Sequence, residues 1–89
     1  MFRTAWRGGI KSDEGFSVWL GRDKLVYGEG KRKMEVTVDF GANEVVIFQV
    51  SIGRWDDDLG NAADEKEKLR IADNIKRAIE WRGYTATLM

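Results

Sequence analysis

The sequence predicts an α+β domain: an antiparallel β-meander, one C-terminal amphipathic helix packed on one face of the sheet, and a final short strand. Three observations lead to this prediction. Apolar and polar residues alternate in several short segments between residues 16 and 52, as in half-buried strands. Between residues 71 and 79 the apolar residues instead recur at helical spacing. A last alternating segment follows Gly83, and a single helix must bury its apolar stripe against the sheet.

The first half of the chain reads as short strands separated by turns. Phe2–Ile10 is either an edge strand or a loose arm, and the residues from Lys11 to Gly15 resemble a turn. Phe16–Leu20 alternates and predicts a strand. Lys24–Tyr27 predicts another, and Gly28-Glu29-Gly30 supplies the glycines that a hairpin loop requires.

Two further strands follow. Met34–Phe40 alternates most regularly, and Gly41-Ala42-Asn43 after it predicts a hairpin turn. Val45–Ile52 is more apolar, which suits a central strand that is partly covered on both faces. Its expected core face consists of Val46, Phe48, Val50 and Ile52.

The helix has clear ends. Asn61 or Asp64 can accept a first-turn N–H group, and Asp64 with Glu67 has the spacing of a capping box. Gly83 fits the left-handed position that ends a helix, and Tyr84–Met89 then predicts the last strand. If this strand is parallel to the strand before the helix, the connection is long enough for a right-handed crossover. The apolar stripe consists of Ile71, Ala72, Ile75, Ala78 and Ile79.

The composition limits the possible functions. A chain of 89 residues forms one domain, residues 1–89. Basic and acidic residues number 15 each, whereas a dedicated nucleic-acid binder usually has a basic excess. A basic patch would therefore have to be assembled by folding. The absence of cysteine and histidine excludes disulfides, thiolate nucleophiles, the usual structural zinc sites and the commonest general base.

The sequence also allows a prediction of the cellular location. Met1–Ile10 has no apolar run of signal-peptide length, and no segment approaches 18 apolar residues. We therefore expect a soluble, cytoplasmic protein without a membrane partner.

Catalytic motifs are not apparent. Ser12, Ser17 and Ser51 have no histidine partner, so a serine triad is impossible. The carboxylates lie outside the apolar strands, and we expect them to form a solvated surface rather than an acid–base pair. The sequence predicts a protein that is not an enzyme and needs no cofactor.

The best candidate for partner binding is the strand-to-helix corner, where a tryptophan precedes three acids. Trp55 either packs in the core under the first helical turn or stands exposed as an anchor, because tryptophan and arginine dominate interface hot spots. The acids could instead form a calcium loop, but glycine and asparagine fall at the wrong positions of an EF-hand. The predicted contact residues are Arg54, Trp55, Asp56, Asp57, Asp58 and, on a neighbouring strand, Trp19.

One basic cluster, Lys31-Arg32-Lys33, supports an alternative. With aromatic residues nearby it could follow a phosphate backbone, which would make the chain a nucleic-acid-binding domain. The simpler interpretation is a hairpin whose charges keep the sheet edge soluble.

The order of motifs resembles a known family. Tyr27-x-Glu29-Gly30 comes first, then Ser51-Ile52-Gly53-Arg54-Trp55-Asp56, and then a helix from Glu67 to Gly83. Over roughly residues 24–88 the chain is similar to the Immunity protein 74 family of bacterial polymorphic toxin systems. Family members often have two prolines after the Trp-acid pair, whereas this chain has Asp57-Asp58. The resemblance implies a protein that neutralises a cognate toxin by binding it.

The sequence therefore predicts a non-enzymatic protein-binding domain, and the family resemblance implies that its partner is a toxin domain. Homo-oligomers are compatible with it, and a domain with a purely structural role is the remaining alternative.

Overall fold

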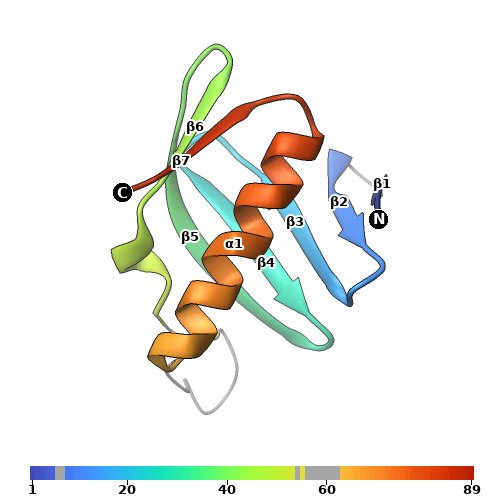
Figure 1. Ribbon diagram of the computed structural model, residues 1–89, viewed down its shortest axis with the longest axis vertical. Coiled ribbons are helices and arrows are strands. Elements are labelled where there is room, and N and C mark those ends of the chain that lie inside the picture. Colours follow the sequence, from blue (N-terminus) through green and yellow to red (C-terminus); the bar gives the residue numbers. More distant parts are fainter. Residues whose placement is uncertain (6–7, 54, 56–62) are drawn as a thin grey trace.

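The computed structural model describes residues 1–5, 8–53, 55 and 63–89. These residues form seven strands, one 3-10 turn and one α-helix (Figure 1). In chain order the elements are β1 (Phe2–Thr4), β2 (Ile10–Ser12), β3 (Phe16–Leu20), β4 (Lys24–Glu29), β5 (Arg32–Phe40), β6 (Glu44–Ile47), η2 (Gln49–Ser51), α1 (Glu65–Trp81) and β7 (Thr85–Leu88).

The strands form one sheet whose spatial order follows the chain from β1 to β7. Each neighbouring pair is antiparallel except β6 and β7, which are parallel and are joined through α1. The predicted α+β class, with a meander, one helix and a final strand, is confirmed. Within the segment Phe2–Ile10, Phe2–Thr4 forms an edge strand and Ile10 begins a second strand, β2.

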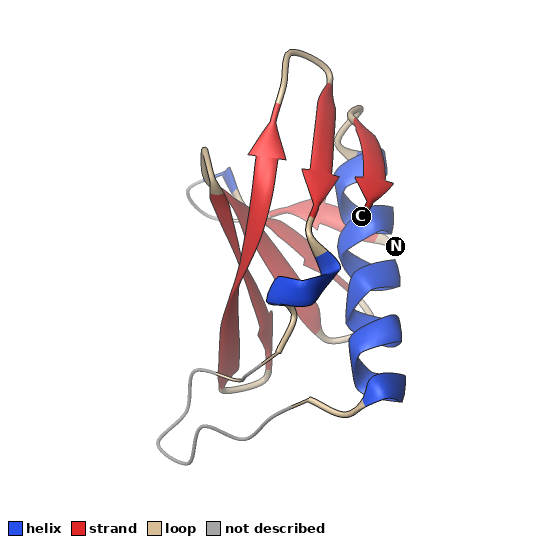
Figure 2. Ribbon diagram, turned by 90° about the vertical axis from the view of Figure 1, so that its left-hand side faces the viewer, coloured by secondary structure: helices blue, strands red, loops and turns tan. Residues whose placement is uncertain are grey.

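Helix α1 lies across one face of the sheet, so the molecule has two layers (Figures 1 and 2). We call this the inner face and the opposite one the outer face. The helix buries the predicted stripe together with Asn74. The same inner face of the strands supplies Phe16, Val18, Leu25, Tyr27, Met34, Val36 and Val38. These residues make one continuous core between the layers.

Both ends of the helix form as the sequence predicts. The Asp64 side chain accepts a hydrogen bond from the Glu67 N–H at 2.8 Å, which satisfies one of the donors left free in the first turn. Gly83 has a φ of 101° after the last turn, a conformation that glycine adopts without steric cost. The Tyr84 N–H then bonds back to the Ile79 carbonyl at 3.3 Å, so the chain reverses into β7.

The predicted strand Val45–Ile52 is wrong in length and in its core face. β6 ends at Ile47, and the chain turns through η2. Ser51 holds this turn: its hydroxyl donates to the Phe48 carbonyl at 2.6 Å and accepts from the Thr37 N–H at 2.8 Å. Within β6 the pairing of Val45 with Phe40 and of Ile47 with Val38 puts Val45 and Ile47 on the inner face. The turn then ends the alternation, so that Ile52 is buried whereas Val50 is 94% exposed.

Candidate functional site

The predicted contact corner falls largely outside the described residues, which include neither Arg54 nor Asp56, Asp57 and Asp58. Trp55 is described and is only 2% exposed. Its indole N–H donates to a Glu67 carboxylate oxygen at 2.9 Å, and its ring centroid lies 6.1 Å from that of Tyr27. The interpretation of Trp55 as an exposed anchor is therefore corrected: its side chain packs in the core beneath the helix.

Trp19 lies on the outer face of β3 and is half-buried. Its ring packs over glycine: a Cβ atom added to Gly9 would approach the indole nitrogen to 2.4 Å, and one added to Gly28 would lie 3.8 Å from the ring. The Lys33 ammonium is 5.9 Å from the ring centroid. Trp19 thus remains a candidate contact residue, on the face opposite to Trp55.

Folding separates the basic cluster of the β4–β5 hairpin. The Arg32 guanidinium lies 4.1 Å from the Trp55 ring centroid and 3.9–4.0 Å from the carboxylates of Glu29 and Glu67, on the helix side. Lys33 follows it in β5 and faces the opposite side, near Trp19. Arg32 and Lys33 therefore lie on opposite sides of the hairpin.

A polar network that runs from the core to the surface connects the hairpin with the helix. The Tyr27 hydroxyl donates to Glu29 and accepts from the Asn74 amide at 3.0 Å. Arg70 binds both carboxylate oxygens of Glu29. Burial and the hydrogen bond to Glu29 raise the pKa of Tyr27 well above its ordinary value. Burial alone would raise the pKa of Glu29, but the hydrogen bonds from Arg70 and Tyr27 outweigh it and lower that pKa.

A second ionic link lies further along the helix. Arg77 binds both carboxylate oxygens of Glu14, at 2.8 and 3.3 Å, and donates through Nε to Asp73 at 3.1 Å. The hydrogen bond from Arg77 lowers the pKa of Glu14. A general acid near neutral pH needs a raised carboxyl pKa. The pKa values of Glu14 and Glu29 are instead lowered. Both links serve to hold the helix on the sheet.

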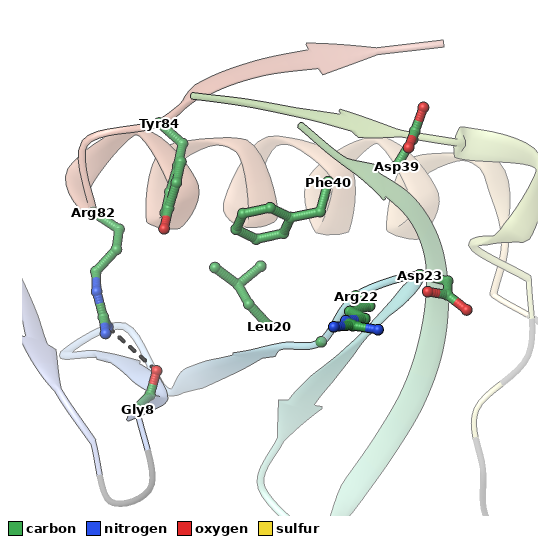
Figure 3. A pocket seen from close by; sticks show the side chains of 9 residues that line it. Gly8, Leu20, Arg22, Asp23, Asp39, Phe40, Arg82 and Tyr84 are labelled. Atoms are coloured by element: carbon green, nitrogen blue, oxygen red, sulfur yellow. Dashed lines mark hydrogen bonds between the residues drawn. The ribbon is translucent and has the colours of Figure 1, made fainter. Parts of the chain in front are cut away.

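An open cleft of about 790 Å³ lies in the described surface (Figure 3). It lies where the β3–β4 turn, the end of β5 and the chain leaving α1 meet. Its lining consists of Gly8, Leu20, Gly21, Arg22, Asp23, Asp39, Phe40, Arg82 and Tyr84. Sequence analysis did not single out any of these residues as a site.

The floor of the cleft is apolar. Leu20, Phe40 and Tyr84 point toward one another from three separate segments (Figure 3). The rings of Phe40 and Tyr84 meet edge to face with centroids 5.0 Å apart, an arrangement that holds both in place. All three are only partly buried, so the floor is accessible from outside.

Charged side chains surround this floor. Arg82 donates to the Gly8 carbonyl at 3.2 Å and so closes one end (Figure 3). Arg22, Asp23 and Asp39 are exposed, and their side chains form no ion pair or hydrogen bond with another described residue. The rim therefore offers charges of both signs to a ligand.

In the described part of the chain, no three acidic side chains gather as they would around a metal ion. The predicted calcium-loop alternative lies outside the described residues. None of the described segments forms a helix with the length and apolar character needed to cross a membrane.

Comparison with protein-family models, curated proteins and solved structures gives no match for this chain.

Proposed function

We propose that this chain is a non-enzymatic protein-binding domain that contacts its partner through the cleft. The observation that carries the proposal is the arrangement of an accessible apolar floor inside a rim of unpaired charges. Protein interfaces have the same anatomy, with an apolar core inside a polar rim. Tyrosine and arginine are enriched among interface hot spots, and the cleft is lined by Tyr84, Arg22 and Arg82.

The chemistry of the cleft suggests what the partner presents. The space between Leu20, Phe40 and Tyr84 suits a bulky apolar side chain of the partner, which would lose contact with water there. Arg22 lies beside Asp23 on the rim, so a partner needs charges in a matching order rather than one overall sign (Figure 3). This requirement favours a specific protein surface over a small apolar molecule.

The resemblance to the Immunity protein 74 family supports a more specific form of the proposal. In that form the partner is a toxin domain, and binding alone neutralises it. An immunity protein needs no catalytic groups, which is compatible with ionised, arginine-bound carboxylates at Glu14 and Glu29.

The direct test uses the proteins encoded next to this chain's own gene. Each is purified and titrated against the chain, and the dissociation constant is measured by calorimetry. We expect one neighbour to bind with a submicromolar constant and to lose its toxicity when the two are co-expressed. Absence of binding by every neighbour would overturn the toxin-neutralising form of the proposal.

Charge reversal tests whether the cleft is the contact surface. Arg22→Glu changes an exposed rim residue without removing a described contact, so the fold should be retained. Lys66→Glu makes the same charge change on an exposed position of α1, away from the cleft, and serves as the matched control. We expect Arg22→Glu to weaken partner binding at least tenfold and Lys66→Glu to leave it nearly unchanged. Equal effects would show that the contact lies elsewhere.

A further inference from the structure

The outer face of the sheet carries a second feature, a row of residues that crosses five strands. The pairing register places Arg3 opposite Lys11, Lys11 opposite Ser17, Ser17 opposite Gly28, and Gly28 opposite Lys33. Residues directly opposite one another in antiparallel strands lie on the same face of the sheet. Folding thus aligns three cations that are widely separated in the sequence. We call these five residues the transverse row.

The charges of the transverse row are available to a ligand. Arg3, Lys11 and Lys33 are exposed, and none forms an ion pair with another described residue. The acids two positions beyond Lys11 and Lys33 are engaged in ion pairs. The Asp13 carboxylate lies 3.8 Å from the N-terminal ammonium, and that of Glu35 lies 3.9 Å from the Lys24 ammonium.

The middle of the row is hollow. Gly28 has no side chain and Ser17 has a short one, so a cavity of about 250 Å³ opens between Lys11 and Lys33. Trp19 forms one of its walls. A ligand in this cavity would meet two ammonium groups, a hydroxyl and the side of an indole ring.

These groups match the chemistry of a nucleic-acid strand. Lysine binds phosphate as a point charge, and the arginine fork binds phosphate as well as carboxylate. Neighbouring strands lie about 4.8 Å apart, so the row from β1 to β5 spans roughly 19 Å, too long for one small anion. Proteins that bind single strands combine such a positive track with aromatic side chains beside it.

We propose that the transverse row binds the phosphate backbone of a single-stranded nucleic acid, with a base packed in the cavity beside Trp19. The site differs from the predicted Lys31–Lys33 cluster, because Arg32 faces the helix and only Lys33 belongs to the row. The balanced net charge is no obstacle, since folding places these cations together and pairs the nearby acids. This site is independent of the cleft.

The test is a salt titration with a fluorescently labelled oligothymidylate of about twelve nucleotides, followed by anisotropy. With three phosphate contacts, log K should fall against log salt with a slope of about −2. This slope corresponds to about 20-fold weaker binding in about 200 mM salt than in about 50 mM salt. No binding at the lower salt concentration would overturn the proposal.

Variants locate the site. The double substitution Lys11→Gln and Lys33→Gln should reduce the slope to about −0.7, because two contacts are lost. Lys66→Gln and Lys76→Gln, both on α1, remove the same charge from the other layer and should leave the slope at about −2. Equal slopes in both double variants would overturn the assignment. Equally tight binding of a polyglutamate peptide would overturn the nucleic-acid assignment in favour of an acidic protein segment.

Discussion

Trp55 is the largest of the fully buried side chains, and it links the helix with two strands. Its ring packs near Tyr27 of β4, lies under the Arg32 guanidinium of β5, and bonds to Glu67 of α1. Replacement of a buried tryptophan by alanine removes these contacts and leaves a cavity. We expect Trp55→Ala to lower the free energy of unfolding by about 3–5 kcal/mol in urea denaturation.

A second variant keeps this test decisive if Trp55→Ala does not fold. Trp55→Phe retains an aromatic ring but loses the N–H donor to Glu67, so we expect a smaller loss of about 1–2 kcal/mol. Trp81→Ala is the control at a tryptophan that is 45% exposed, and it should cost less than Trp55→Ala. An unchanged denaturation midpoint in Trp55→Ala would contradict the core assignment.

The raised pKa of Tyr27 predicts how the stability of the protein changes at alkaline pH. Its pKa is raised in the folded protein by burial and by Glu29, whereas in the unfolded chain it titrates near 10. Above pH about 10 the unfolded chain therefore releases a proton that the folded protein keeps, so stability falls as pH rises. Ultraviolet absorbance of phenolate should show that Tyr27 ionises at a higher pH in the folded protein than in the unfolded chain.

Tyr27→Phe provides the check on this assignment. It should remove the alkaline loss of stability, while Tyr84→Phe should retain it. At neutral pH, Tyr27→Phe should still cost about 1–3 kcal/mol, because the Asn74 amide and Glu29 lose their buried partner. An alkaline loss of stability that is as large in Tyr27→Phe as in the parent protein would refute the prediction.

At the scale of the element, the helix depends on its N-terminal cap. The Asp64 carboxylate accepts the Glu67 N–H and lies beside the positive end of the helix dipole. Asp64→Ala should therefore reduce stability by about 1 kcal/mol, measured as a lower urea midpoint at unchanged m-value. Asp64→Asn keeps the acceptor and should cost less than half as much. Equal losses would mean that the hydrogen bond is not what stabilises this end.

The helix and the strands differ in how well local sequence determines them. The stripe of α1, the Asp64 cap and the Gly83 stop depend on neighbouring residues, and all three form as predicted. The end of β6 depends instead on Thr37, 14 residues away, whose N–H bonds to the Ser51 hydroxyl. The core face of β6 is likewise set by its pairing with β5, in which Val45 lies opposite Phe40 and Ile47 opposite Val38. Periodicity reveals neither contact, because both apolar faces of Val45–Ile52 fit the pattern equally well.

The same reason explains why the cleft was not predicted. Leu20, Phe40 and Tyr84 come from three distant segments, and each also fits an ordinary core position in its own strand pattern. Only the strand order brings them to one end of the sheet. The transverse row depends on the pairing registers of the strands, which make neighbours of Lys11, Ser17, Gly28 and Lys33. A sequence from which these registers can be derived would also predict the row.

At the scale of the whole molecule, the two proposed surfaces lie on different parts of the sheet and share no residue. The cleft opens beside the chain that leaves the helix, whereas the transverse row lies on the outer face. Substitutions at one surface should therefore leave the other unaffected, since distant sites usually act additively. A protein partner and a nucleic-acid strand could accordingly bind at the same time.

One continuous core joins both layers, and it predicts that the domain unfolds as a single unit. Core residues extend from Ile10 in β2 to Ala86 in β7, and the helix packs on both halves of the sheet. Tryptophan fluorescence and far-ultraviolet circular dichroism should therefore give superimposable urea transitions.

Variants in opposite layers make this prediction stringent. Gly9→Ala places a methyl group 2.4 Å from the Trp19 indole nitrogen on the outer face, so the ring must move, at a cost of about 1–3 kcal/mol. Asp64→Ala acts at the far end of the helix layer. In a cooperative domain each variant shifts both transitions equally, wherever the change lies. If Asp64→Ala moved only the dichroism transition, the helix would unfold separately and its links through Arg70 and Arg77 would be weaker than their geometry suggests.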